Sequence, residues 1–202
     1  MDRARILVAD DHPLMLKTIR DFITERGYEV VGTATDGPAI LDSILKLSPD
    51  IAFIDNQMPH LSGLEVARQC FENNFNSKIV LISFDTKINS IDTLKSLHLA
   101  GYLLKDSIIN EFETCVETVM KGEHYLSQKI REQQIQEINQ LTPSEKKILK
   151  LIAQENSLSG LHERLFMNES QWEEMIRALL KKLHLKSEES LLMWIQTNKS
   201  SL

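Results

Sequence analysis

Three aspartates in the first part of the chain follow apolar segments and could share one site. Asp10 and Asp11 come directly after the apolar run 6–9, and Asp55 comes directly after 51–54. Three carboxylates within a few ångströms of one another repel strongly, and a cation is the physical solution. Oxygen ligands suit Mg²⁺, which keeps several waters and accepts phosphate oxygens. We therefore predict a Mg²⁺ site formed by these three side chains.

The same residues could carry out covalent phosphoryl transfer. An aspartate carboxylate can act as the nucleophile toward a phosphoryl group. Ser83 and Lys105 each follow a later apolar segment. The lysine ammonium and the metal would neutralise charge on the transferred group, and the serine hydroxyl can donate to a phosphate oxygen. A phosphoryl dianion is a strong acceptor, so its arrival would pull Ser83 inward and rearrange the helix that follows.

The apolar segments before these residues are typical of buried strands. Five of them alternate with five segments of helical spacing over about 120 residues, which predicts a parallel sheet covered on both faces. Sites in such sheets form at the carboxyl ends of the strands, so the residues named above would converge on one edge. The predicted strands span 5–9, 28–34, 51–54, 78–83 and 101–104, and the predicted helices span 13–26, 38–47, 63–72, 86–99 and 108–121.

Composition is typical of globular domains. Of the 202 residues, 42% are hydrophobic and 26% are charged, and the length suffices for two domains. No apolar run approaches the roughly 18 residues of a membrane span, and Asp10 and Asp11 interrupt the early apolar run that could start a secretory signal. We expect Cys70 and Cys115 to be small apolar helix residues in a reduced, cytoplasmic compartment. The sequence leaves a disulfide between them open.

Charge divides the chain into two parts. Residues 141–202 hold nine basic and eight acidic residues, whereas the rest of the chain holds 14 basic and 21 acidic ones. This difference indicates an acidic domain at 1–125, a linker at 126–140 and a nearly neutral domain at 141–202. The overall net charge of −6 gives no support for nucleic-acid binding.

The start of the second domain is marked by a helix-capping pattern. Thr142 is a suitable N-cap, Pro143 fits the first helical position, and Glu145 completes a capping box. We expect three or four short amphipathic helices after it. The glutamine-rich segment 128–140 before it has no Gly or Pro, so it could be a helical extension or a solvated linker. We favour a linker with partial helix.

Residues 3–125 resemble the receiver domain of two-component response regulators, a flavodoxin-like fold with a five-stranded parallel sheet. The matching set occurs in the family's order, which makes the resemblance specific. It consists of the acidic pair Asp10-Asp11, the phosphoacceptor segment Asp55 to Pro59 with Gly63, the switch hydroxyl Ser83, the switch aromatic Tyr102 and the invariant lysine Lys105.

The resemblance implies that Asp55 receives a phosphoryl group from a sensor histidine kinase. It also implies that the acidic residues and the backbone carbonyl of Gln57 bind Mg²⁺, and that the phosphoryl group is lost by slow self-hydrolysis, as in a timer rather than an enzyme. A hydrolytic phosphatase is the alternative, but it lacks a general acid or base beside Asp55, and Gln57 is a poor candidate. The chain departs from the family at Phe84, where a small residue is usual, and a ring there could restrict access to Asp55.

Residues 141–196 resemble the helix-turn-helix output domain of LuxR/NarL-type regulators, a small all-α fold. Residues 141–145 and 148–153 match the opening of that domain, and 164–166 match the end of its scaffold helix. The resemblance implies a DNA-binding transcriptional regulator. The candidate DNA contacts are Gln171, Glu174, Arg177, Lys181, Lys182 and Lys186.

The DNA-facing positions fit the family poorly. Leu158 and Ser159 stand where the family has Asn and Lys, and Glu173 and Glu174 lie in the recognition helix. Carboxylates there repel phosphates, although one Glu can accept from cytosine N4. The alternative is therefore a protein-interaction regulator whose output fold serves dimerisation or partner binding. In both cases the resemblance suggests a homodimer on phosphorylation.

Overall fold

The protein divides into two units along its chain. A computed structural model describes residues 3–86, 88, 91–183, 185–199 and 202. The first unit spans residues 1–128 and the second spans residues 129–202. Each unit buries its own cluster of hydrophobic side chains, as independent domains do.

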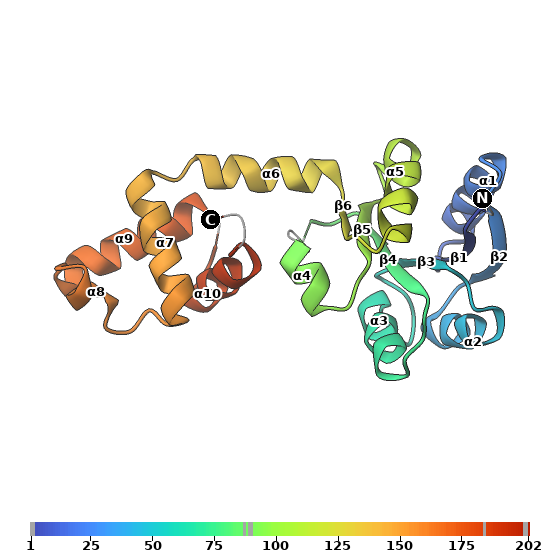
Figure 1. The fold of residues 1–202 in the computed structure, drawn as a ribbon, viewed down its shortest axis with the longest axis horizontal. Helices are drawn as coiled ribbons and strands as arrows, with labels where there is room; N and C mark the ends of the chain where they lie inside the picture. Colours follow the sequence, from blue (N-terminus) through green and yellow to red (C-terminus); the bar gives the residue numbers. More distant parts are fainter. Residues whose placement is uncertain (1–2, 87, 89–90, 184, 200–201) are drawn as a thin grey trace. The chain divides into compact units, whose positions relative to one another are not determined.

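The first unit is built around a parallel sheet (Figure 1). The described residues form six strands in the order β2-β1-β3-β4-β5-β6, and every neighbouring pair is parallel. The predicted five-stranded parallel sheet is confirmed, and a short sixth strand extends it. The strands are β1 (Arg5–Ala9), β2 (Glu29–Ala34), β3 (Ile51–Asp55), β4 (Lys78–Ser83), β5 (Gly101–Leu104) and β6 (Tyr125–Leu126).

Helices cover both faces of this sheet. In Figure 1, α1 and α5 lie on one face, and α2 and α3 lie on the other. Both faces are therefore shielded from water, which is why β1, β3 and β4 are apolar along almost their whole length. The helices of this unit are α1 (Pro13–Glu25), α2 (Gly37–Leu47), α3 (Gly63–Glu72), α4 (Ile91–Ser96) and α5 (Ile108–Met120).

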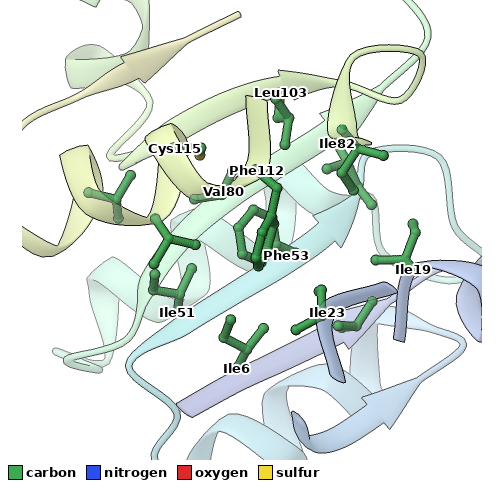
Figure 2. Packing of buried hydrophobic residues seen from close by; sticks show 14 of the residues in the cluster. Ile6, Ile19, Ile23, Ile51, Phe53, Val80, Ile82, Leu103, Phe112 and Cys115 are labelled. Carbon is green, nitrogen blue, oxygen red and sulfur yellow. The ribbon is translucent and has the colours of Figure 1, made fainter. Parts of the chain in front are cut away.

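The core between the sheet and α1 and α5 is shown in Figure 2. Ile19 and Ile23 of α1 and Phe112 of α5 belong to one buried cluster with Phe53 of β3. The rings of Phe53 and Phe112 have centroids 5.3 Å apart. Burying such side chains stabilises the fold by about 1.5–3 kcal/mol each. The rigid sheet that results fixes where its strands end.

The turn after β3 packs closely against the end of that strand. A Cβ atom at Gly63 would lie 2.7 Å from the carbonyl oxygen of Asp55, so a glycine is needed for this approach. Ser62 caps α3 and forms a capping box with Glu65. The helix begins at Gly63, as predicted, and its return toward β3 restricts the backbone at Asp55.

The fourth helix is shorter than predicted. We expected a helix over 86–99, but α4 spans Ile91–Ser96, and the earlier residues are not helical where they are described. Residues 87, 89 and 90 of that expectation lie outside the described residues. His98 has a φ of 56°, in the left-handed region, which ends the helix. Apolar spacing alone did not locate either end.

The segment 128–140, which we expected to be a linker with partial helix, is helical except for its last residue. Helix α6 covers Gln128–Asn139, so the helical alternative is correct. Ile138 is buried in the core of the second unit, whereas Ile135 is exposed. The second unit also contains α7 (Pro143–Glu155), α8 (Leu161–Arg164), α9 (Glu169–Lys182) and α10 (Glu188–Thr197).

The capping pattern predicted for the second unit is present. The side chain of Thr142 accepts a hydrogen bond from the Glu145 amide, the Glu145 carboxylate accepts one from the Thr142 amide, and Pro143 opens α7. Trp172 is buried in the core of this unit. These contacts fix α7 against the loop that precedes it.

Both cysteines are buried free thiols, Cys70 in α3 and Cys115 in α5, so neither takes part in a disulfide. Burial raises the pKa of the Cys70 thiol to about 11, which keeps it protonated and unreactive. Among the described residues, no helix combines the length and the hydropathy needed to cross a membrane.

Candidate functional site

The carboxyl ends of four neighbouring strands bring four polar side chains to one edge of the sheet. Asp10 follows β1, Asp55 ends β3, Ser83 ends β4 and Lys105 follows β5, and these strands are adjacent in the sheet. All four residues are buried, with exposures of 0%, 4%, 4% and 8% in that order. Charged groups are seldom buried unless they are paired. The three buried charges are therefore expected to form ion pairs with one another.

Lys105 forms ion pairs with both buried aspartates. Its Nζ lies 2.7 Å from Asp10 Oδ2 and 2.8 Å from Asp55 Oδ2. The second oxygen of Asp10 accepts a hydrogen bond from the His12 amide at 2.9 Å. One ammonium therefore bridges two carboxylates that would otherwise repel each other, and it holds them at a fixed separation.

Burial and charge shift the protonation of this pair. Burial raises the pKa of Asp55 above its usual range, and the Lys105 ammonium offsets part of that effect. Burial also opposes the charge on Lys105, but its contacts with Asp10 and Asp55 raise the pKa of the ammonium overall. Lys105 thus stays positively charged at neutral pH.

A set of donor atoms suited to a divalent cation lies beside this bridge. Asp10, Asp11, His12 and Asp55 each offer one ligand atom, and these atoms lie within 4.8 Å of one another. Asp11 Oδ1 is buried and accepts no hydrogen bond among the described residues, although His12 Nδ1 lies 2.7 Å from it. A cation would satisfy this oxygen, which is costly to leave unpaired. The three carboxylates therefore fit Mg²⁺.

A cavity of about 250 Å³ opens onto these groups. Gln57 lines it, and the Gln57 amide donates to Asp55 Oδ1 at 3.4 Å. Phe84 also lines it, with Lys105 Nζ 5.2 Å from the centre of the ring. The Phe84 side chain is 72% exposed, so the ring stands at the mouth of the cavity rather than inside it.

Ser83 is connected to Tyr102 through Asp85. The Asp85 amide donates to Ser83 Oγ at 3.2 Å. The Tyr102 hydroxyl donates to the carbonyl oxygen and to the Oδ1 atom of Asp85, both at 2.9 Å. Tyr102 is 1% exposed, so its ring is held inside the unit. A displacement of Ser83 would therefore be transmitted to a buried aromatic ring and to the segment before α4.

In the second unit, most of the candidate DNA contacts are exposed. Gln171, Glu174, Arg177 and Lys181 lie on α9, and Lys186 lies in the segment that follows it. Lys182 differs, because its ammonium contacts the Glu145 carboxylate at 2.7 and 2.9 Å. Lys182 therefore joins α9 to the start of α7, and of the six it is the least available to a ligand.

Three residues of note were missed by the reading of the sequence. His12 completes the donor set, and its position directly after the acidic pair could have revealed it. Asp85 holds Tyr102, but nothing in the sequence pattern indicates this pairing. Phe166 is 97% exposed. Its φ of 55° is a strained conformation for an aromatic residue. Neither feature can be inferred from the sequence pattern.

Comparison with known proteins assigns the family. The family model of the response regulator receiver domain matches residues 6–117, more than half of the chain. The nitrate/nitrite response regulator protein NarL of Escherichia coli is 30% identical over 204 residues, which cover 95% of this chain and 94% of that protein. The chain therefore belongs to the response regulator family, and its relatives are two-component regulators of the NarL type.

Two further comparisons extend over both units. The transcriptional regulatory protein DesR of Bacillus subtilis is 28% identical over 183 residues, covering 90% of this chain and 91% of that protein. A structure of the RcsB response regulator of Salmonella typhimurium, described for its conformational dynamism in DNA interaction, aligns with a TM-score of 0.67 at 20% identity. That alignment covers 96% of this chain and 98% of the RcsB chain, and it confirms the fold class of a parallel α/β unit followed by a helical one.

Proposed function

We propose that Asp55 accepts a phosphoryl group from a sensor histidine kinase and that this modification controls the second unit. The observation that carries the proposal is the bridge formed by Lys105 between Asp10 and Asp55, directly beside a donor set for Mg²⁺. A nucleophilic carboxylate, a fixed ammonium and a cation site are together the parts that phosphoryl transfer needs. The cavity over Asp55 leaves room for the transferred group.

The proposed step uses the residues of this pocket in defined roles. An oxygen of Asp55 attacks phosphorus as the phosphorus–nitrogen bond of the donor's phosphohistidine breaks, and the imidazole leaves with the electron pair. The Lys105 ammonium stabilises the charge on the phosphoryl oxygens. A bound Mg²⁺, held by Asp10, Asp11, Asp55 and the carbonyl of Gln57, would supply further charge neutralisation. The Ser83 hydroxyl would donate to one phosphoryl oxygen.

The path from Ser83 to Tyr102 supports a switch. If Ser83 moves toward a phosphoryl oxygen, its hydrogen bond from the Asp85 amide must change. Asp85 also accepts from Tyr102, so the ring and the segment before α4 respond together. The charge of the phosphoryl group could thus shift the Ser83, Asp85 and Tyr102 side chains between two arrangements. We propose that the altered surface binds a second copy of the chain.

For the second unit we propose DNA binding and transcriptional regulation. The names of the relatives and the helix-turn-helix order of α7 to α10 support it. Exposed Arg177, Lys181 and Lys186 could neutralise phosphates, which provides most of the affinity of such proteins for DNA. Gln171 and Glu174, one helical turn apart on α9, could reach base edges.

A protein-interaction role is the second candidate, and specific observations favour it. Glu173 and Glu174 are exposed on α9 and would repel DNA phosphates. The exposed ring of Phe166 borders a hollow that Met167, Met175 and Ala178 also line. Exposed apolar side chains of this kind are more typical of protein contacts than of DNA contacts.

One experiment tests both the switch and the output. The untagged chain, with and without beryllofluoride as a phosphoryl mimic, is subjected to selection from random DNA, and its oligomeric state is measured in parallel. If one DNA sequence is enriched only in the presence of the mimic, and the affinity for it falls with salt concentration, the DNA-binding regulator is supported. No enrichment, with dimerisation on addition of the mimic, favours the interaction regulator. Asp55→Ala should abolish either response, and an unchanged response in this variant would overturn the proposed switch.

A further inference from the structure

A histidine stands at the edge of the proposed cation site. His12 Nδ1 lies 2.7 Å from Asp11 Oδ1 and 3.4 Å from Asp10 Oδ1. It is the nitrogen member of the four-residue donor set that also contains Asp55. The other three residues offer carboxylate oxygens, so His12 turns an all-oxygen set of ligand atoms into a mixed nitrogen and oxygen set.

The His12 ring is able to serve as a ligand. Its side chain is 74% exposed, and it lines both the cavity over Asp55 and the neighbouring hollow formed with Leu14 and Phe84. Although His12 is the N-cap residue of α1, its side chain makes no capping hydrogen bond. The ring can therefore turn toward an ion without breaking a contact that holds the helix.

A neutral imidazole discriminates among divalent cations in a way that a carboxylate does not. Mg²⁺ is bound through oxygen and keeps several waters. Nitrogen ligands suit Co²⁺, Ni²⁺ and Zn²⁺, whose affinities for a mixed nitrogen and oxygen site also exceed those of the earlier dications. An added imidazole should thus strengthen the binding of these ions and change little for Mg²⁺.

We propose that His12 is a metal ligand and that it makes the pocket selective for first-row transition-metal dications of the Co²⁺, Ni²⁺ and Zn²⁺ class. This inference rests on the cation site of the proposed function. His12 and Asp11 supply adjacent nitrogen and oxygen ligands after β1, and Asp55 supplies an oxygen from the neighbouring strand β3. The buried Asp11 Oδ1 is the oxygen closest to the imidazole, with His12 Nδ1 2.7 Å away.

Calorimetric titrations of the untagged 202-residue chain with MgCl₂ and with CoCl₂ test the proposal. His12→Ala should weaken Co²⁺ binding by at least about tenfold and Mg²⁺ binding by less than about twofold. Exposed His98, which stacks on Phe71 away from the pocket, provides the matched control. His98→Asn should leave both affinities unchanged, and Asp11→Ala should weaken both.

A spectroscopic measurement identifies the ligand directly. The Co²⁺ form should show a paramagnetically shifted exchangeable imidazole N–H resonance in its proton NMR spectrum, and His12→Ala should lose it. The proposal is overturned if His12→Ala binds Co²⁺ as tightly as the parent protein or keeps the resonance. It is also overturned if His98→Asn weakens Co²⁺ binding equally, because binding to surface histidines would then explain the affinity. If neither ion binds in an Asp11-dependent manner, the cation site of the proposed function fails as well.

Discussion

The Lys105 ammonium lies 2.7 Å from Asp10 Oδ2, 95 residues earlier in the chain. Asp55 completes the bridge from β3, one of the two strands that lie between β1 and β5 in the sheet. Because all three groups are nearly shielded from solvent, each charge depends on the others. The pocket is therefore held together by electrostatics as much as by packing.

Removing the positive charge should destabilise the first unit. Lys105→Met keeps a similar side-chain length but leaves two buried carboxylates without their ion-pair partner, and breaking a buried pair in this way costs about 3–5 kcal/mol. Calorimetric unfolding of the full chain measures the effect. Both tryptophans, Trp172 and Trp194, lie in the second unit, so tryptophan fluorescence separates its transition from that of the first.

The control for this experiment is an exposed lysine in an exposed pair. Lys46 contacts Asp42 at 2.7 Å on the surface of α2, so Lys46→Met should change stability by less than about 1 kcal/mol. If Lys105→Met is no more harmful than Lys46→Met, the buried bridge does not stabilise the fold.

Phe84 should slow the exchange of the phosphoryl group with solvent. Its ring stands at the mouth of the cavity over Asp55, where it limits the approach of water and of small donors. Phe84→Ala should increase the rate of dephosphorylation by roughly threefold or more, as measured by the decay of the phosphorylated protein. Phe71→Ala, another exposed aromatic residue, should leave the rate unchanged, and equal rates in all three proteins would contradict the role of Phe84.

The pair formed by Glu145 and Lys182 should make the second unit sensitive to acid. Burial alone would raise the pKa of Glu145, but the Lys182 ammonium and the Thr142 amide lower it below its ordinary value of 4.5. A lowered pKa in the folded state stabilises the unit above about pH 4.5, and this stabilisation is lost as the pH falls through the folded-state pKa. Glu145→Gln should thus cost about 1 kcal/mol at pH 7 and less at pH 3.

Urea unfolding followed by tryptophan fluorescence at the two pH values checks this prediction. Glu163→Gln, at an exposed position of α8, is the control and should show little difference at either pH. A penalty for Glu145→Gln that is as large at pH 3 as at pH 7 would show that the charge on Glu145 is irrelevant.

Reversing an acidic charge on α9 should strengthen DNA binding. Glu173 lies on the exposed part of this helix, so Glu173→Lys replaces a repulsion of phosphate by an attraction. Each additional phosphate neutralised should steepen the dependence of log affinity on log salt concentration by about 0.9. Fluorescence anisotropy with random-sequence duplex DNA measures this slope. Glu189→Lys on α10 carries the same charge change, and an identical slope for both variants would mean that α9 does not face DNA.

Much of the first unit could be predicted because its strands are buried on both faces. The runs ending at Asp10 and Asp55 are apolar at every position, so their strands are unambiguous. The parallel order then brings Asp10, Asp55, Ser83 and Lys105 to one edge without further information. Helix caps such as Thr142 could also be predicted from the sequence, because the capping box is a local pattern.

Features that depend on tertiary contacts could not be predicted. Strand β6 has two residues, Tyr125–Leu126, too few for any periodicity to be recognised. The pairing of Tyr102 with Asp85 and the full exposure of Phe166 depend on how distant segments pack. The place of His12 directly after the acidic pair could have suggested it as a ligand, but the 2.7 Å approach of its ring to Asp11 Oδ1 could not be predicted.

The central claim is that Asp55 is the residue that accepts the phosphoryl group. The untagged protein is incubated with Mg²⁺ and acetyl phosphate, and its mass and phosphopeptides are determined by mass spectrometry under conditions that preserve acyl phosphates. We predict one phosphoryl group on the peptide that contains Asp55, its absence from Asp55→Asn and its retention in Asp106→Asn, at an exposed aspartate next to Lys105. A phosphoryl group on another residue, or undiminished labelling of Asp55→Asn, would contradict the account.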